Sequence, residues 1–175
     1  STLFNKLTDA GVLVEDRLFA TLDTRTKKWK LGNGVEVLLS DTVGFVRNIP
    51  HHLVASFKAT LEEAINADLL LHVIDISSDD AESQIKSVKK GLRGFGGGNK
   101  PVLEIFNKVD AAKDIEQLEM LQTMHPEALS LSAKNGYGLD ALAEVVTAKY
   151  KGQELSLSVT SKTSDGRVQS YLRAN

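Results

Sequence analysis

The sequence predicts an α/β fold in which a mostly parallel sheet is flanked by helices. Apolar runs of strand length alternate along the chain with runs of helical periodicity. The connections between them are long enough for right-handed crossover helices, which favours parallel strands. Short polar motifs follow three of the strand-like runs, at the sheet edge where open α/β sheets bind ligands.

Composition agrees with one compact domain. The chain has 175 residues, of which 42% are hydrophobic, enough for a single core. The net charge of −2 gives no global basic field, so any nucleic-acid contact would be local. The absence of cysteine excludes disulfides and thiol catalysis and fits a cytoplasmic protein. No apolar run approaches the roughly 20 residues of a membrane span.

The first elements are a helix and a hairpin. A helix is expected over Ser1–Ala10, ended by Gly11. Two strands, Arg25–Leu31 and Val35–Ser40, flank the turn sequence Gly32-Asn33-Gly34, which is typical of a β-hairpin. Residues 12–24 are expected to form a loop.

The middle of the chain predicts a helix, a buried strand and a second helix. Apolar residues at helical spacing indicate a helix over Leu53–Asn66. The continuous apolar run Leu69–Ile76 is typical of a buried parallel strand. A helix over Asp79–Leu92 would be capped by Ser78 or by Asp79 itself.

The last third continues the alternation after a glycine-rich segment, Arg93–Lys100, which is expected to be flexible. The elements expected after it are strand Val102–Phe106, helix Asp114–Met124, strand Ala128–Leu131 and helix Leu139–Tyr150. The pattern changes after residue 150. Residues 1–150 are therefore interpreted as one domain, and 151–175 as the start of a C-terminal domain or an ordered tail.

The motif Asn107-Lys108-Val109-Asp110 can recognise guanine. It follows an apolar strand, and the Asp110 carboxylate can accept hydrogen bonds from the N1–H and the exocyclic amine of guanine. Adenine presents no such donor pair, so it would leave the carboxylate unpaired. Asn107 can hold the loop and reach N7, while the stem of Lys108 can lie along the ring. By itself the motif is also compatible with a plain surface turn.

Two further motifs follow strands. In Asp41-Thr42-Val43-Gly44, the aspartate can hold Mg²⁺ directly or through water, and the glycine lets a backbone N–H approach a γ-phosphate. In Ser132-Ala133-Lys134, backbone N–H groups can contact the guanine O6. Each alone is weak evidence, but their order and spacing together with the guanine motif predict a GTPase-type nucleotide-binding domain.

The chain begins where a phosphate-binding loop would end. Residues 1–7, STLFNKL, fit the helix that follows the pattern G-x-x-x-x-G-K-[ST], with Ser1 as the hydroxyl that binds Mg²⁺ and Thr2 beside it. An ordinary helix N-cap is the alternative for this pair. The glycines, the lysine and the strand before them are not in the sequence, so we expect the first strand and the phosphate loop to be missing from this chain.

Longer segments resemble the GTPase domain of the HflX family of bacterial translation-associated GTPases. The resemblance covers Ser1 to about Tyr150 and rests on Asp16–Asp23, Leu39–Arg47, Ile49–Phe57, Thr60–Glu63 and Ala67–Asp75. It implies a Ras-like P-loop NTPase G domain, GTP hydrolysis with Mg²⁺, GTP and GDP as ligands, and binding to the large ribosomal subunit. A monomer is expected.

The resemblance also adds nucleotide-binding residues in the first switch, Phe19, Ala20, Thr21, Leu22 and Asp23, with Thr21 as a metal ligand beside Ser1 and Asp41. Ras-like GTPases carry a water-orienting glutamine at the position of Phe45, which has no hydrogen-bonding group. Slow intrinsic hydrolysis is therefore expected, and no residue is assigned a catalytic role. The competing interpretation is a truncated fragment or a non-catalytic interaction module, and this chain alone is expected to be inactive.

Four other residues are interpreted as structural. His72 is expected to be a core histidine with a satisfied ring N–H, and His125 to interact with the negative end of its helix. Trp29 is expected to be half-buried. Asp75 is expected to cap the next helix or to brace the nucleotide loops.

Overall fold

The computed structural model describes residues 2–8, 25–32, 34–42, 66–94, 100–112 and 114–151. The loop expected over residues 12–24, nearly all of the helix expected over Leu53–Asn66, and the tail after residue 151 lie outside these ranges. The described elements are α1 (Thr2–Thr8), β1 (Arg25–Gly32), β2 (Val35–Asp41), β3 (Leu70–Asp75), α3 (Ala81–Gly94), β4 (Val102–Asn107), η3 (Val109–Ala111), α4 (Ile115–Met124), β5 (Leu129–Ser130) and α5 (Leu139–Lys151).

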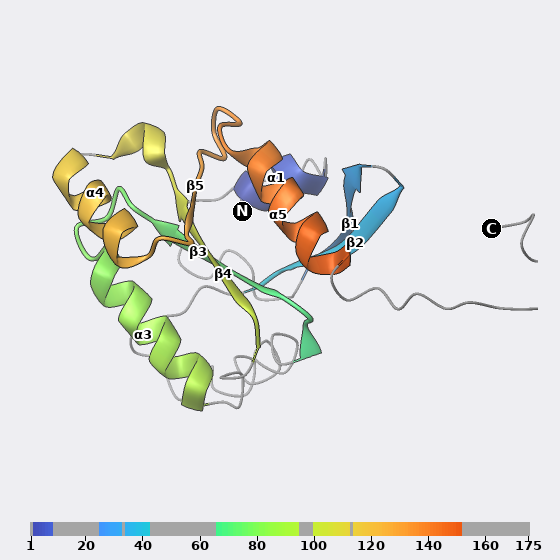
Figure 1. The fold of residues 1–175 in the computed structure, drawn as a ribbon, viewed down its shortest axis with the longest axis horizontal. Coiled ribbons are helices and arrows are strands. Elements are labelled where there is room, and N and C mark those ends of the chain that lie inside the picture. Colours follow the sequence, from blue (N-terminus) through green and yellow to red (C-terminus); the bar gives the residue numbers. More distant parts are fainter. Residues whose placement is uncertain are drawn as a thin grey trace, which may run out of the picture.

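The described strands form two sheets. β1 and β2 are an antiparallel hairpin, as the glycine-rich turn predicts. β3, β4 and β5 form a parallel sheet with β4 in the centre, which confirms the parallel part of the prediction. The helices cover both faces of this sheet, with α3 and α4 on one side and α1 and α5 on the other (Figure 1).

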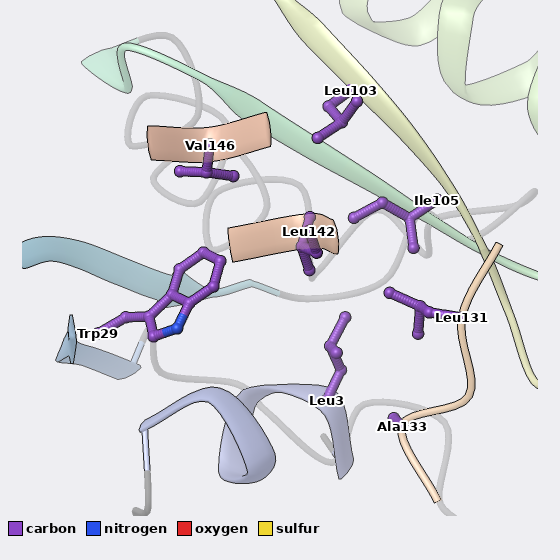
Figure 2. Close-up of a cluster of buried hydrophobic side chains, with 8 residues drawn as sticks. All are labelled: Leu3, Trp29, Leu103, Ile105, Leu131, Ala133, Leu142 and Val146. Atoms are coloured by element: carbon purple, nitrogen blue, oxygen red, sulfur yellow. The ribbon is translucent and has the colours of Figure 1, made fainter. Parts of the chain in front are cut away.

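Alternation along β4 separates two cores. Leu103 and Ile105 point to the side of α5, where they join a cluster that also contains Leu3, Trp29, Leu131, Ala133, Leu142 and Val146 (Figure 2). Phe106 points the other way and packs with Ile74, Ile85 and Leu121 beneath α3 and α4. Successive residues of a strand face opposite sides, so one strand can supply both cores.

Trp29 corrects the expectation of half-burial, because it is only 4% exposed. It lies on the inner face of β1, opposite Val37 of β2, within the cluster formed with α1 and α5. Its burial depends on packing between elements that are more than 100 residues apart in sequence, and alternation within the hairpin could not show this.

The boundaries of the described elements differ from the sequence prediction by at most two residues. α3 begins at Ala81 rather than Asp79 and includes Arg93 and Gly94, which were assigned to the flexible segment. Ser78 contributes to the start of this helix, because its hydroxyl accepts a hydrogen bond from the N–H of Asp80 at 3.4 Å. For α4, Asp114 is the N-cap, and its carboxylate accepts hydrogen bonds from the N–H groups of Glu116 and Gln117.

A polar cluster around Glu104 of β4 lies on the α3 and α4 side of the sheet. One carboxylate oxygen is 2.6 Å from Nδ1 of His125 and the other is 3.0 Å from Nζ of Lys89. His72, the register partner of Glu104 on β3, has its Nδ1 3.7 Å from the same carboxylate. Burial raises the pKa of Glu104, but hydrogen bonds from Lys89 and His125 outweigh it and hold the pKa below its usual value.

The structure corrects the expectation for His72 and adds a side-chain contact to that for His125. His125 follows α4, but its ring contacts Glu104, while its backbone N–H donates to the carbonyl of Leu121. Nδ1 of His72 is buried and has no hydrogen-bond partner among the described residues. Burial therefore lowers the pKa of His72, despite the attraction of Glu104. Cross-strand neighbours set these contacts, and a single apolar strand does not reveal them.

Candidate nucleotide-binding site

The site is built at the carboxyl ends of β4 and β5. Asn107 is the last residue of β4, and its Oδ1 accepts two backbone hydrogen bonds, one from Lys108 at 2.8 Å and one from Ala133 at 3.1 Å. Ala133 belongs to the loop after β5, which lies beside β4 in the sheet. The Asn107 side chain therefore ties the two motif loops together, as its predicted loop-holding role requires.

The chain turns sharply after Asn107. Lys108 adopts a left-handed backbone conformation with φ of 66°, which residues with a Cβ rarely adopt. A short 3₁₀ turn, Val109–Ala111, follows, and the N–H of Val109 donates to the carbonyl of Leu131 at 3.3 Å. This turn was not anticipated from sequence, and it leaves Asp110 exposed at the sheet edge.

The Asp110 carboxylate is oriented by a hydrogen bond from Ser132. The hydroxyl of Ser132 donates to Oδ1 of Asp110 at 2.5 Å, and Ser132 itself is fully buried. A carboxylate oxygen has more than one acceptor site, so Asp110 retains capacity for further donors. The sequence assigned the Ser132 loop a role through its backbone only. Its hydroxyl is therefore an orienting group that sequence reasoning missed.

The loop after β5 is compact. The N–H of Gly136 donates to the carbonyl of Ser132, and the N–H of Ser132 donates to the carbonyl of Tyr137, both at 2.9 Å. Gly138 has φ of 76°, and a Cβ there would lie 2.5 Å from the carbonyl oxygen of Ser130. A glycine is thus needed where the loop passes close to β5. Lys134 is exposed on this loop.

Asp75, at the end of β3, braces the same region. Its Oδ2 lies 2.6 Å from Nζ of Lys108, while its Oδ1 accepts hydrogen bonds from the hydroxyl and N–H of Ser77 at 2.6 and 3.0 Å. Partial burial raises the pKa of Asp75, but the bonds from Lys108 and Ser77 outweigh it, so the pKa lies below its usual value. Of the two roles expected for Asp75, the structure shows the brace.

The residues expected around the phosphates are only partly described. Asp41 is the last residue of β2, Thr42 follows it and is exposed, and Thr2 is exposed at the start of α1. Ser1, Phe19, Ala20, Thr21, Leu22, Asp23, Val43 and Gly44 lie outside the described residues. The structure therefore joins the base-side motifs and leaves the phosphate-side predictions as predictions.

Within the described residues, no group of three or more His, Asp or Glu side chains is placed to hold a metal ion. An Mg²⁺ ion bound with a nucleotide needs fewer, because one or two carboxylates and the phosphates complete its shell. The carboxylate of Asp41 is a hard oxygen group of that kind. No described helix is long and apolar enough to cross a membrane.

A comparison with protein families matches residues 1–108 to the family described as 50S ribosome-binding GTPase. Among curated proteins, the GTPase HflX of Caldanaerobacter subterraneus is 48% identical over 146 residues, and that of Lacrimispora saccharolytica is 43% identical over 170 residues. The HflX of Escherichia coli is 37% identical over 171 residues. These alignments cover 83%, 97% and 97% of this chain, but only 33%, 40% and 40% of the relatives.

Solved structures show the same fold. The SsGBP–GDP complex aligns with a TM-score of 0.70 and 26% identity, covering 89% of this chain and 47% of that one. Aquifex aeolicus Era bound to GDP and aluminium fluoride aligns with a TM-score of 0.60 and 24% identity, over 92% of this chain and 55% of that one. The Ras-like fold and the HflX resemblance are thus confirmed, and the chain belongs to the family of 50S ribosome-binding GTPases, with HflX proteins among its relatives.

Proposed function

We propose that this chain carries the guanine-binding part of an HflX-type GTPase that acts with the large ribosomal subunit. The observation that supports this most directly is the joining of two motif loops, in which Asn107 binds the backbone of Ala133 and Ser132 binds Asp110. Two loops held in this way would place the Asp110 carboxylate and the backbone of the loop after β5 around a single planar ligand.

The base edge is read by Asp110. Its carboxylate would accept hydrogen bonds from the N1–H and the amine of guanine, while the N–H of Lys134 would face O6, because that of Ala133 donates to Asn107. Since Ser132 already orients Asp110, little ordering is needed when the base arrives. Adenine would leave the carboxylate unpaired at a cost of about 1–3 kcal/mol or more, which favours guanine.

The phosphate side is proposed from the family pattern. Ser1, Thr21 and Asp41 would hold Mg²⁺, which supplies charge neutralisation at the phosphates when bound. Phe45 offers no hydrogen bond to water, so the positioning group would come from another loop or from the ribosome. Ribosome binding would place the protein in the cytoplasm, and we propose a monomer.

Nucleotide selection tests the base-side proposal. In the full-length protein, fluorescent GDP should bind and should be displaced by GTP but not by ATP. Asp110→Asn should shift the preference from GTP toward XTP by roughly 100-fold, because xanthine presents an acceptor where guanine has its amine. Asp114→Asn is the matched control, since Asp114 caps α4 and asparagine caps equally well. Equal displacement by ATP and GTP would contradict the proposal.

Turnover separates the enzyme from an interaction module. Single-turnover GTP hydrolysis by the full-length protein should be slow alone and faster with purified large ribosomal subunits. Nucleotide binding without hydrolysis under either condition would favour a non-catalytic module.

A further inference from the structure

We propose that Asp75 and Ser77 form a positioning pair that acts through Lys108 to hold the guanine-binding loop in its binding conformation. This inference rests on the proposed function, because it deepens the role of the same site. It assigns the loop after β3 a part in nucleotide retention, although that loop contains none of the three nucleotide-binding motifs.

The parallel register brings the pair to Lys108. Asp75 is opposite Asn107 in the β3–β4 pairing, and the N–H of Ile76 donates to the carbonyl of Asn107 at 3.2 Å. The ends of both strands therefore move together. The next residue after Asn107 is Lys108, so its side chain starts within reach of the Asp75 carboxylate.

Asp75 is itself oriented before it meets the lysine. The two hydrogen bonds from Ser77 fix Oδ1, and they leave Oδ2 directed to Nζ of Lys108 at 2.6 Å. An ion pair with one partner already fixed loses less side-chain entropy than a pair of two free chains. Ser77 therefore strengthens the ion pair between Asp75 and Lys108.

The ion pair affects the binding loop because Lys108 has an unusual backbone conformation. It is the one non-glycine residue with positive φ among the described residues. Its backbone N–H is held by Asn107, and its ammonium is held by Asp75. Anchoring both ends fixes the direction of the aliphatic stem, which the proposed function places along the ring of the base.

Release of this anchor should lower retention without changing recognition. Without the Asp75–Lys108 ion pair, the nucleotide-free protein would sample loop conformations in which the stem of Lys108 does not lie in the direction that the base requires. A ligand that needs one conformation then binds with an affinity reduced by the fraction of molecules in that conformation. Asp110 still reads the base edge, so the ratio of guanine to adenine binding should stay the same.

Dissociation of fluorescent GDP from the full-length protein tests the pair. Asp75→Asn should speed dissociation roughly three- to tenfold, as expected for loss of a partly exposed ion pair, and Ser77→Ala should have a smaller effect. The preference for GTP over ATP should not change. Glu82→Gln is the matched control, because it removes an exposed carboxylate that pairs with Lys86 on α3, away from the loop.

A double-mutant cycle separates positioning through Lys108 from a general structural role. Lys108→Met keeps the stem and removes the ammonium. In that background Asp75→Asn should produce no further acceleration. An equal acceleration in both backgrounds would overturn the inference, as would an unchanged rate in Asp75→Asn alone.

Hydrogen exchange without nucleotide keeps this result distinct from the proposed function. The N–H groups of Lys108 and Ala133 both donate to Asn107, so peptides that cover them should exchange faster in Asp75→Asn and no faster again in the double variant. If the wild-type protein fails to bind GDP but exchange behaves in this way, the guanine proposal fails and the positioning role stands. Unchanged exchange in Asp75→Asn would overturn the positioning role.

Discussion

Two polar clusters attached to β4 differ in what their carboxylates face. At the end of the strand, Asp110 is exposed and is oriented by the buried hydroxyl of Ser132. Earlier in the same strand, Glu104 points beneath α3 and α4 and meets Lys89 and His125. The first carboxylate is left available to a ligand, whereas the second contacts basic side chains within the protein.

The difference shows that the position of a carboxylate relative to one strand decides whether it binds a ligand or stabilises the fold. A partly buried carboxylate that is paired with cations stays ionised and contributes to folding, as the lowered pKa of Glu104 indicates. A carboxylate beyond the strand end keeps its solvation and can exchange water for a ligand. Substitutions in the two clusters should therefore affect different measurements.

The largest effect is expected from Asn107→Ala. This change removes the acceptor that joins the N–H groups of Lys108 and Ala133. Affinity for guanine nucleotides should fall roughly 100-fold, because the bond within the loop after β4, the bond to the loop after β5 and any bond to the base are lost together. The free energy of unfolding should change by only about 1 kcal/mol. Nucleotide titration and urea unfolding of the full-length protein measure the two quantities.

Asn107→Asp sharpens this prediction. Aspartate keeps an oxygen at the Oδ1 position and can still accept both backbone bonds, but it cannot donate to the base. A smaller loss of affinity than in Asn107→Ala would show that holding the loop matters in its own right. Equal losses would assign the whole effect to the contact with the base.

Glu104→Ala is expected to lower stability and to leave nucleotide affinity almost unchanged, the reverse of Asn107→Ala. His125 and Lys89 lose their carboxylate partner, and the His125 side chain is only 12% exposed. The free energy of unfolding should fall by about 1–3 kcal/mol, with little change in nucleotide affinity once the protein is folded. Glu82→Gln, at an exposed pair, should leave the free energy of unfolding nearly unchanged. A large loss of affinity in folded Glu104→Ala would join the two clusters into one functional unit.

The elements of both regions could be predicted from sequence, because strand and helix periodicities are local. Asn107, Asp110 and Ser132 were found through their place after strands. The contacts that distinguish the clusters could not be found in this way. The Asp75–Lys108 pair, the Ser132–Asp110 bond and the Glu104 cluster all join side chains from different elements. Their partners are set by register and helix packing, which no local pattern encodes.

Trp29 illustrates the same limit within the apolar core. Its place in a hairpin strand was predicted, but its depth depends on α1 and α5 covering the inner face of β1. His72 shows the limit for a polar residue, since an apolar strand suggested a satisfied ring and, within the described part of the chain, Nδ1 has no hydrogen-bond partner.

The smallest effect is expected from the titration of His72. Burial lowers its pKa below 6.5, with Lys89 and His125 acting in the same direction and Glu104 opposing them. The unfolded chain therefore binds a proton at a higher pH than the folded chain does. Stability from this group is fully present above about pH 6.5 and is lost as pH falls through the folded pKa, at no more than about 1.4 kcal/mol per pH unit.

Urea unfolding at pH 7.5 and at pH 5.5 measures this loss, and His72→Gln provides the comparison. Glutamine does not titrate, so the variant should lose less stability between the two pH values than the wild-type protein. Glu104 has a lowered pKa and loses its contribution only below about pH 4.5, outside this window. The pH dependence between 7.5 and 5.5 can then be assigned to the histidine rather than to the carboxylate. Identical losses in both proteins would show that the buried cluster accommodates a charged His72, and that Glu104 compensates its burial.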